Sequence, residues 1–156
     1  MEVGNGMTHA EDRTHFVMWS MLASPLIMGN DLRSASKETI KTLTNKEIIA
    51  VNQDKLGIQG FRFSNENNME IWIKPLEGDA WAMAFVNMSD KPVDFNFDWN
   101  KHDIGDDVNG KFLQTKHKTY SVRDLIQHKD IGNTNSGLKT TIGAHDVFLI
   151  KVQPIN

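Results

Sequence analysis

Cysteine is absent from this sequence of 156 residues, and its absence excludes a disulfide scaffold, a thiolate metal site and a cysteine nucleophile. Long hydrophobic runs are absent as well. The longest apolar cluster, residues 16–28, contains Ser20, Ser24 and Pro25 and is too short to cross a bilayer, so we expect no membrane partner. No basic head followed by an apolar run marks a signal peptide, and the sequence leaves the compartment open.

Dense positive charge is also lacking. Lys and Arg number 17 against 20 Asp and Glu, a net charge of −3, and they are spread along the chain. Such a pattern gives no support to a phosphate-tracking surface, so we expect no nucleic-acid partner. No two of the six histidines form a ligand motif, so we expect no metal site. The remaining composition, 39% hydrophobic and 24% charged, is that of a globular protein rather than a disordered one.

The first third of the chain has a helical pattern. Thr8 followed by Glu11 predicts a capping box, in which each residue binds the backbone N–H of the other. The predicted helix covers residues 11–23. Its first turn is acidic, which suits the positive end of the helix dipole, but its second half is apolar almost all the way round. A helix of this kind needs partners on several sides.

Residues 25–30 form a short apolar run that ends in turn residues, which is typical of a parallel strand buried on both faces. Two further helices are predicted, one capped by Ser36 and one capped by Asn45. The order helix, strand, helix is that of α/β architecture. One parallel strand cannot make a sheet, so either it pairs with another copy of the chain or the rest of the sheet lies outside these residues.

After residue 57 the hydrophobic pattern changes to period two, with turn signals between the apolar stretches. About seven strands in roughly 100 residues are typical of an antiparallel sandwich. Trp72, Trp81 and Trp99 fall on or at the end of predicted strands, where we expect core packing rather than sugar stacking. The predicted strands are residues 61–63, 69–74, 81–86, 93–99, 116–122, 138–142 and 147–152.

Several segments are similar to those of the α-galactosidase (melibiase) family of glycoside hydrolases. Residues 2–7, 11–16 and 23–33 resemble the last strands of its catalytic barrel, and residues 45–54 resemble the connection that leaves it. Further on, Val122-Arg123-Asp124-Leu125 and Ala144-His145-Asp146-Val147 resemble motifs of the family's C-terminal β-domain. The resemblance implies a (β/α)8 barrel followed by an antiparallel sandwich. Family members are often secreted, periplasmic or lysosomal.

The resemblance predicts two parts in this chain: residues 1–56 as a partial catalytic barrel with its last strand and helices, and residues 57–156 as the C-terminal β-sandwich. A complete barrel of this type takes roughly 250 residues, so roughly three quarters of it would be missing. We therefore expect residues 1–56 to expose apolar faces patterned for burial and to be mobile, wrongly docked or aggregation-prone, while residues 57–156 could fold alone.

The family's chemistry is retaining hydrolysis of terminal α-linked galactose by two aspartates, without a metal or organic cofactor. The resemblance places the nucleophile in a Lys-x-Asp motif and the acid/base in an Arg-x-x-x-Asp motif, both on earlier barrel strands. The sequence contains no Arg-x-x-x-Asp, and its one Lys-x-Asp, Lys101-His102-Asp103, falls in a polar loop of the β-region. We therefore expect no catalytic residue in this chain.

Two residues of the first part are candidates for a site. Met1 is a candidate substrate-binding residue, because a methionine edges the galactose pocket in the family; the alternative is a simple initiator. Asp31 follows the predicted strand, where barrel enzymes place catalytic groups. The resemblance gives Asp31 no catalytic role, and we expect it to hold a turn through hydrogen bonds to the backbone.

Three functional interpretations stay open at this point. The first is the C-terminal part of a retaining α-galactosidase, inactive alone and acting on an α-galactoside only as part of the intact enzyme. The second is a non-catalytic carbohydrate-binding or subunit-interaction module, including a homo-oligomer. The third is one chain of a split enzyme whose partner chain carries the missing barrel strands. Sugar specificity, galactose or N-acetylgalactosamine, is not fixed by these residues.

Overall fold

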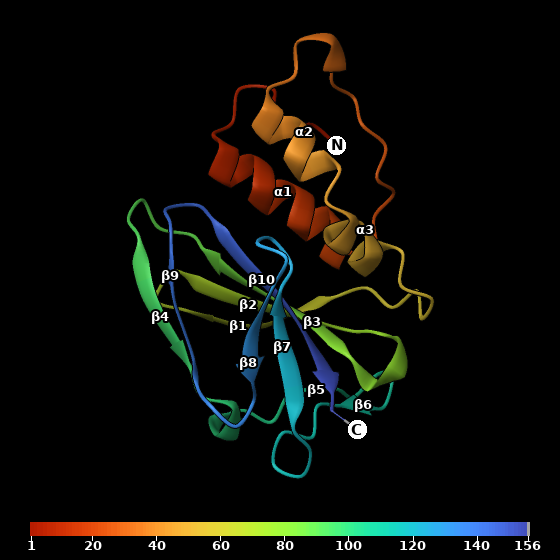
Figure 1. The fold of residues 1–156 in the computed structure, drawn as a ribbon, viewed down its shortest axis with the longest axis vertical. Coiled ribbons are helices and arrows are strands. Elements are labelled where there is room, and N and C mark those ends of the chain that lie inside the picture. Colours follow the sequence, from red (N-terminus) through yellow and green to blue (C-terminus); the bar gives the residue numbers. More distant parts are fainter. Residues whose placement is uncertain (156) are drawn as a thin grey trace.

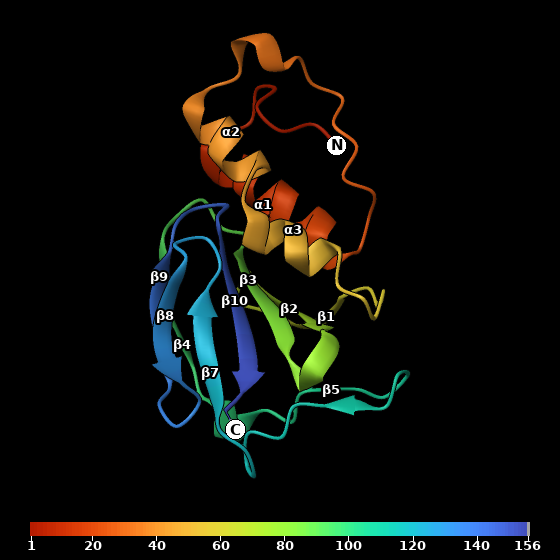
Figure 2. The same ribbon diagram turned by 45° about the vertical axis from the view of Figure 1, so that its right-hand side comes forward.

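The computed structural model describes residues 1–155 and shows three layers. Helices α1 (His9–Met21), α2 (Lys37–Leu43) and α3 (Lys46–Asn52) form the first layer, and α1 and α3 lie against one face of a six-stranded antiparallel sheet. A two-stranded sheet packs on the opposite face of that sheet (Figures 1 and 2). The architecture is the end of a (β/α)8 barrel followed by an antiparallel β-sandwich.

The helices begin at the capping residues that the sequence indicates. Thr8 is the N-cap of α1, and its backbone N–H donates to the Glu11 carboxylate at 2.8 Å while its hydroxyl accepts from the Glu11 N–H at 3.3 Å, so the capping box is confirmed. Ser36 caps α2 and Asn45 caps α3 through side-chain oxygens, as predicted. The polar residues at these starts therefore fix the helix boundaries to within about two residues.

The large sheet has the order β1-β2-β3-β10-β7-β8, so the last strand of the chain lies between β3 and β7. Two smaller pairs, β4–β9 and β5–β6, complete the strands, and short 3-10 turns η1 (Leu32–Ser34), η2 (Glu77–Asp79) and η3 (Trp99–Lys101) connect elements. The strands are β1 (Phe61–Glu66), β2 (Met69–Pro75), β3 (Trp81–Asn87), β4 (Val93–Phe97), β5 (Gly105–Asp106), β6 (Lys111–Phe112), β7 (Tyr120–Asp124), β8 (Lys129–Asn133), β9 (Leu138–Ile142) and β10 (Val147–Pro154).

The strands predicted after residue 57 are present, although one of them is shifted. Three strands of the structure, β5, β6 and β8, were not predicted. β5 and β6 have two residues each, too few for a period to show, and all five residues of β8 are exposed, so no apolar alternation marks it. The strand predicted from residue 116 begins instead at Tyr120, because the residues before it form a turn in which His117 and Lys118 both donate backbone N–H groups to Gln114.

The sandwich core lies between the six-stranded sheet and the β4–β9 pair. Trp81 and Trp99 are each only 2% exposed, and Phe85 contacts Phe95 and Phe97 with ring centroids 4.9 and 5.5 Å apart. The expectation of core packing is therefore confirmed for Trp81 and Trp99. Trp72 points to the other face of the sheet, where it packs against the helix layer and donates its indole N–H to a carboxylate on the same strand.

A second hydrophobic core joins the helices to the sheet. Phe16, Val17 and Met21 of α1 are 0–1% exposed and face a sheet surface that includes Ala82 and Ala84, whose small side chains let the helix approach closely. The sequence led us to expect that residues 1–56 would be mobile, wrongly docked or aggregation-prone. In the structure α1 is instead packed on the sheet through its apolar residues, so the two predicted parts share one core.

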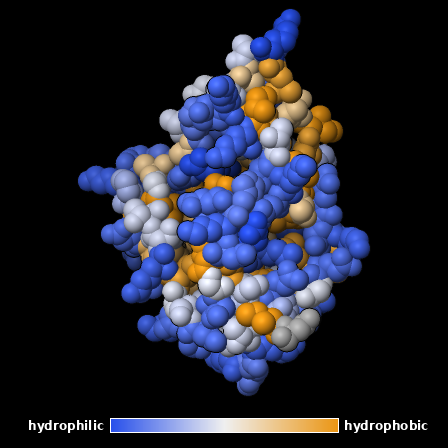
Figure 3. Space-filling view, in the orientation of Figure 1, coloured by the Kyte–Doolittle hydropathy of each residue, from blue (hydrophilic) through white to orange (hydrophobic). Residues whose placement is uncertain are grey.

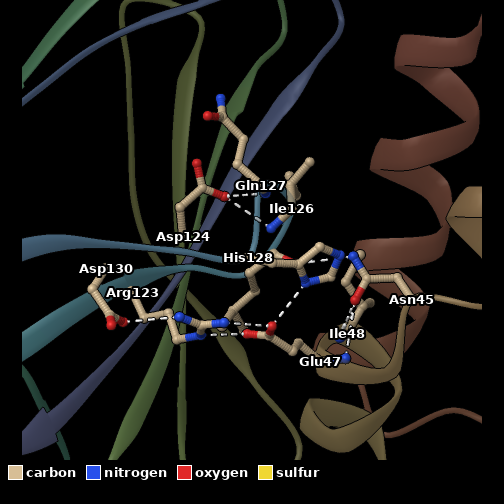
Figure 4. A network of polar contacts seen from close by, with 10 residues as sticks. Asn45, Glu47, Ile48, Arg123, Asp124, Ile126, Gln127, His128 and Asp130 are labelled. Carbon is tan, nitrogen blue, oxygen red and sulfur yellow. Dashed lines mark hydrogen bonds and ion pairs between the residues drawn. The ribbon is translucent and has the colours of Figure 1, made fainter.

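Four polar side chains connect α3 to the β7–β8 hairpin (Figure 4). The Arg123 guanidinium donates twice to the Glu47 carboxylate, at 2.8 and 2.9 Å, and once to Asp130 at 2.9 Å. His128 Nδ1 lies 2.7 Å from the same Glu47 carboxylate. Because of the hydrogen bonds from Arg123, the pKa of Glu47 is lowered. A bidentate pair of this kind fixes orientation as well as distance.

Two further polar contacts link the first part of the chain to the sandwich. Arg13 of α1 forms a bidentate pair with Asp146, at 2.9 and 2.5 Å, in the turn before β10. Asn45, 8% exposed, donates its side-chain amide to the backbone oxygen of Leu125 at 2.9 Å. The two segments that resemble β-domain motifs of the family, residues 122–125 and 144–147, thus supply several of the polar contacts to the helices. The sequence alone does not reveal these partners.

Candidate functional site

The strand predicted at residues 25–30 is not formed, and this prediction was wrong as stated. The backbone there contains a turn in which the Ile27 N–H donates to the Pro25 oxygen at 2.9 Å, and among the described residues its backbone hydrogen bonds to other segments reach only Met1. The Met1 ammonium donates to the oxygen of Ile27 at 3.1 Å, and the Met1 oxygen accepts from the N–H of Gly29 at 2.9 Å. In a parallel pair, one residue bonds through its N–H and its oxygen to the two residues on either side of the residue opposite it. Met1 bonds in this way to Ile27 and Gly29, which flank Met28. A ladder needs more paired residues than these, which explains why no strand results.

Apolar side chains on this segment face solvent. Ile27 is 75% exposed, Met28 42% and Leu32 43%. In the view of Figure 3, hydrophobic surface is visible on the side of the molecule that this segment occupies in Figure 1. Contiguous exposed apolar surface of this kind marks an interaction face. We call residues 1–3 and 25–32, with these side chains, the barrel-derived edge.

Two buried polar atoms next to the barrel-derived edge have no hydrogen-bond partner among residues 1–155: Nε2 of His15 and Oδ1 of Asn30. The side-chain N–H of Asn30 donates to the backbone oxygen of Val3 at 2.8 Å. The side-chain oxygen Oδ1 is therefore held in place without a donor. The His15 ring stacks on Trp19 with centroids 5.9 Å apart. Burial lowers the pKa of His15, and the Met1 ammonium lowers it further. Orphaned polar atoms are costly and call for an explanation.

Met1 is half-buried and packs against the core between the helices and the sheet. Its backbone forms the parallel contact with residues 27 and 29, so the residue lies at the barrel-derived edge. Its suggested role at the border of a sugar pocket stays a prediction. Asn5 donates its amide to the Glu2 carboxylate beside it, so the polar side chains of this segment also bond to one another.

Asp31 performs the local role expected of it. Its carboxylate accepts from the backbone N–H of Arg33 at 3.0 Å and caps η1, and it forms an ion pair with the Arg33 guanidinium at 2.5 Å. Hydrogen bonds from Arg33 lower the pKa of Asp31. The side chain is about half exposed and its hydrogen bonds stay within three residues. The interpretation of Asp31 as a turn residue is confirmed.

The other carboxylates of interest also hold local structure. Asp103, from the one Lys-x-Asp motif, pairs with Lys116 at 2.5 Å at the surface. Asp12, Asp106 and Asp124 are 2–4% exposed, and each accepts at least one backbone N–H, at 2.8–3.1 Å. Each of these buried carboxylates therefore has a hydrogen-bond partner within the chain. Within residues 1–155 no group of three or more His, Cys, Asp or Glu side chains could hold a metal ion.

The helices of residues 1–155 include none long and apolar enough to span a membrane. One parallel contact beside helices, followed by an antiparallel sandwich, is the arrangement that the resemblance to the melibiase family implies for the end of its barrel and its C-terminal domain.

The comparisons with known proteins give the same class. The family model for the "Alpha galactosidase C-terminal beta sandwich domain" matches residues 66–152, and that for "Alpha galactosidase A" matches residues 1–54. The chain belongs to the α-galactosidase (melibiase) family.

Individual relatives extend along nearly the whole chain. Alpha-galactosidase A of Cellvibrio japonicus is 44% identical over 154 residues, which are 99% of this chain and 38% of that protein. Alpha-galactosidase 3 of Arabidopsis thaliana is 37% identical over 159 residues, covering 99% of this chain and 34% of that protein. The crystal structure of alpha-galactosidase I from Mortierella vinacea superimposes with a TM-score of 0.80 at 27% identity, over 95% of this chain and 36% of that one. The chain thus spans less than two fifths of each.

Proposed function

We propose that this chain is the C-terminal part of a retaining α-galactosidase, which removes terminal α-linked galactose, and that the chain by itself does not perform the hydrolysis. The observation that carries the proposal is the similarity over 99% of the chain to proteins named α-galactosidases, of which it spans 38% and 34%. We place the border between its barrel portion and its sandwich between residues 56 and 57.

The carboxylates of this chain support the proposal that the chain by itself does not perform the hydrolysis. Retaining hydrolysis takes two carboxyl groups about 5–5.5 Å apart, one as nucleophile and one as acid/base. The family resemblance assigns both to barrel strands that precede the segments present here. Asp31 is bound to Arg33 and Asp103 to Lys116, so these two candidates are engaged elsewhere.

The barrel-derived edge supports the proposal that the chain is the C-terminal part of a larger enzyme. The two hydrogen bonds of Met1 to residues 27 and 29 have the pattern of a parallel sheet, yet among residues 1–155 no strand continues that pattern on either side. Ile27 is exposed, and one polar atom each of His15 and Asn30 has no partner among residues 1–155. We expect such features on a surface that packs against further polypeptide outside these residues. Further barrel strands would cover the apolar side chains and supply the missing hydrogen-bond partners.

A colorimetric assay tests the proposal. The purified chain, at 17.7 kDa, is incubated with p-nitrophenyl α-galactoside beside an intact α-galactosidase of the family as positive control. We expect no release of p-nitrophenol above buffer in the gel-filtration fractions at this mass. Activity there at a rate comparable to the intact enzyme would refute the proposal, whereas activity at another mass identifies a contaminant.

The same assay distinguishes a split enzyme. The chain is mixed with a polypeptide that carries the part of the C. japonicus relative before the matched region, and both are also assayed singly. Activity that requires the mixture supports completion of the site by a second chain. As a control, Ile27→Glu in the mixture places a charge on the barrel-derived edge and should abolish any activity gained, because a buried unpaired charge opposes docking.

A further inference from the structure

A groove of about 520 Å³ lies at the open side of the sandwich, between the edge strand β1 of the large sheet and β4 of the small one. Its volume falls in the range of small-molecule sites, roughly 300–1,000 Å³. We call it the β1–β4 groove. Its lining residues combine aromatic, aliphatic and uncharged polar side chains with one carboxylate, and include Phe63, Ser64, Glu66, Asn67, Phe95, Asn96 and His102.

The floor of the β1–β4 groove is aromatic. The His102 ring stacks on Phe97 with centroids 4.5 Å apart and an interplanar angle of 9°, and Phe63 meets the same ring edge-on at 6.0 Å. Phe97 is buried, but Phe63, Phe95 and His102 remain partly exposed. The packing of these rings against one another holds flat apolar surfaces at the groove in fixed positions.

The rim of the groove carries polar side chains that have no hydrogen-bond partner in the described chain. The side chains of Ser64, Glu66 and Asn67 make no hydrogen bond or ion pair with the rest of the described chain, residues 1–155, whereas Asn96 lies on the outer face of β4, opposite Phe95 and Phe97. The backbone of Asn67 is nevertheless held in a tight turn. Asn67 and Asn68 have φ of 52° and 61°, which makes the β1–β2 connection a two-residue turn with left-handed residues at both positions. The Asn67 amide and the Ser64 hydroxyl therefore lie at the groove without hydrogen-bond partners among residues 1–155.

We propose that the β1–β4 groove binds neutral pyranose rings of an oligosaccharide. A pyranose has an apolar C–H face that packs on an aromatic ring and hydroxyl groups round its edge that both donate and accept hydrogen bonds. The aromatic floor matches the first property, and the unpaired Asn67 amide and Ser64 hydroxyl match the second. No Lys or Arg lines the groove, so nothing in it attracts an anionic ligand. The proposal stands on this geometry and is independent of the catalytic assignment.

An extended peptide added to the free edge of β1 is the competing occupant, and the strand itself disfavours it. The register of β1 against β2 shifts between Arg62 and Ser64, which places a β-bulge at Phe63. A bulge twists the edge and interrupts the row of backbone groups that an added strand would need. The bulged residue is instead one of the rings that line the groove.

An NMR titration of the ¹⁵N-labelled chain tests the site, with raffinose as a neutral trisaccharide probe. We expect saturable shifts confined to β1, the 67–68 turn, β4 and the region of His102. Asn67→Gly removes the amide of the 67–68 turn while glycine tolerates the positive φ there, and it should weaken binding by up to about tenfold, the value of one lost hydrogen bond. Phe63→Ala should weaken binding by a similar factor through lost stacking.

Two variants elsewhere serve as matched controls. Asn100→Ala removes an exposed amide outside the groove, and Phe112→Ala removes a ring that is 56% exposed on β6. Both should bind raffinose as the unaltered chain does. A flat titration to about 50 mM, shifts outside the groove, or equal loss in the control variants would overturn the proposal. So would a groove that takes up an extended peptide or a second copy of the chain in preference to the sugar.

Discussion

Truncation of Phe16 to alanine tests whether the helix layer and the sheet form one cooperative unit. The Phe16 side chain is 1% exposed in the core between α1 and the sheet, with Val17 and Met21 at 0% beside it. Phe→Ala at such a position costs about 3–5 kcal/mol through lost burial and the cavity left behind. Total stability of a domain is about 5–15 kcal/mol, so the change removes a large share of it.

The measurement is urea unfolding followed by far-UV circular dichroism and by tryptophan fluorescence. For a slope near 2 kcal/mol per molar urea, the midpoint should fall by about 2 M, with both probes moving together. Trp19 lies on α1, whereas Trp81 and Trp99 lie in the sandwich, so fluorescence reports on both layers. Coincident transitions would confirm that the two parts unfold as one unit.

Ile27→Ala is the matched control. It also shortens an apolar side chain in the first part of the chain, but Ile27 is 75% exposed, so the change should stay within about 0.5 kcal/mol. The reasoning fails if Phe16→Ala costs less than about 1 kcal/mol. It also fails if that variant loses α1 in a separate early transition while the sandwich transition stays in place.

Three further predictions concern contacts between the layers. Gly60→Ala should destabilise by about 1–3 kcal/mol in urea unfolding, because its Cβ would lie 2.9 Å from the Met21 oxygen. Arg13→Met should cost about 1–3 kcal/mol by the same measurement, because it leaves the partly buried Asp146 without its bidentate partner. Glu47→Gln should make stability less dependent on pH: the folded pKa of Glu47 lies below its usual 4.5, so its contribution is present above about pH 4.5 and is lost as pH falls through the folded pKa.

The first two of these predictions have their own control variants. Gly57→Ala, where a Cβ would meet nothing within 4 Å but φ is +63°, separates backbone strain from the clash at Gly60. Arg33→Met removes a guanidinium from a pair that is 91% exposed on the arginine side and should be nearly neutral. Equal effects of Arg13→Met and Arg33→Met, or unchanged acid sensitivity in Glu47→Gln, would contradict the assigned roles.

Local signals were read correctly from the sequence because their partners are close in the chain. A capping side chain such as Thr8, Ser36 or Asn45 bonds to N–H groups two or three residues away, so residue type and spacing suffice. The same holds for Asp31 and its turn. The strand predicted at residues 25–30 failed for the opposite reason: hydrophobic pattern states a preference, while a strand also needs a neighbour along its length.

The sequence by itself determined that this is a globular chain with helices first and an antiparallel sandwich after, and its motifs indicated the α-galactosidase family. Only the tertiary structure decided which face of α1 is buried, that Arg123 meets Glu47 and Arg13 meets Asp146, and that the β1–β4 groove remains open. Those contacts join residues 76 and 133 positions apart. They follow from the topology that places β10 between β3 and β7, because packing between distant segments is set by the assembled layers and leaves no periodic trace in the chain.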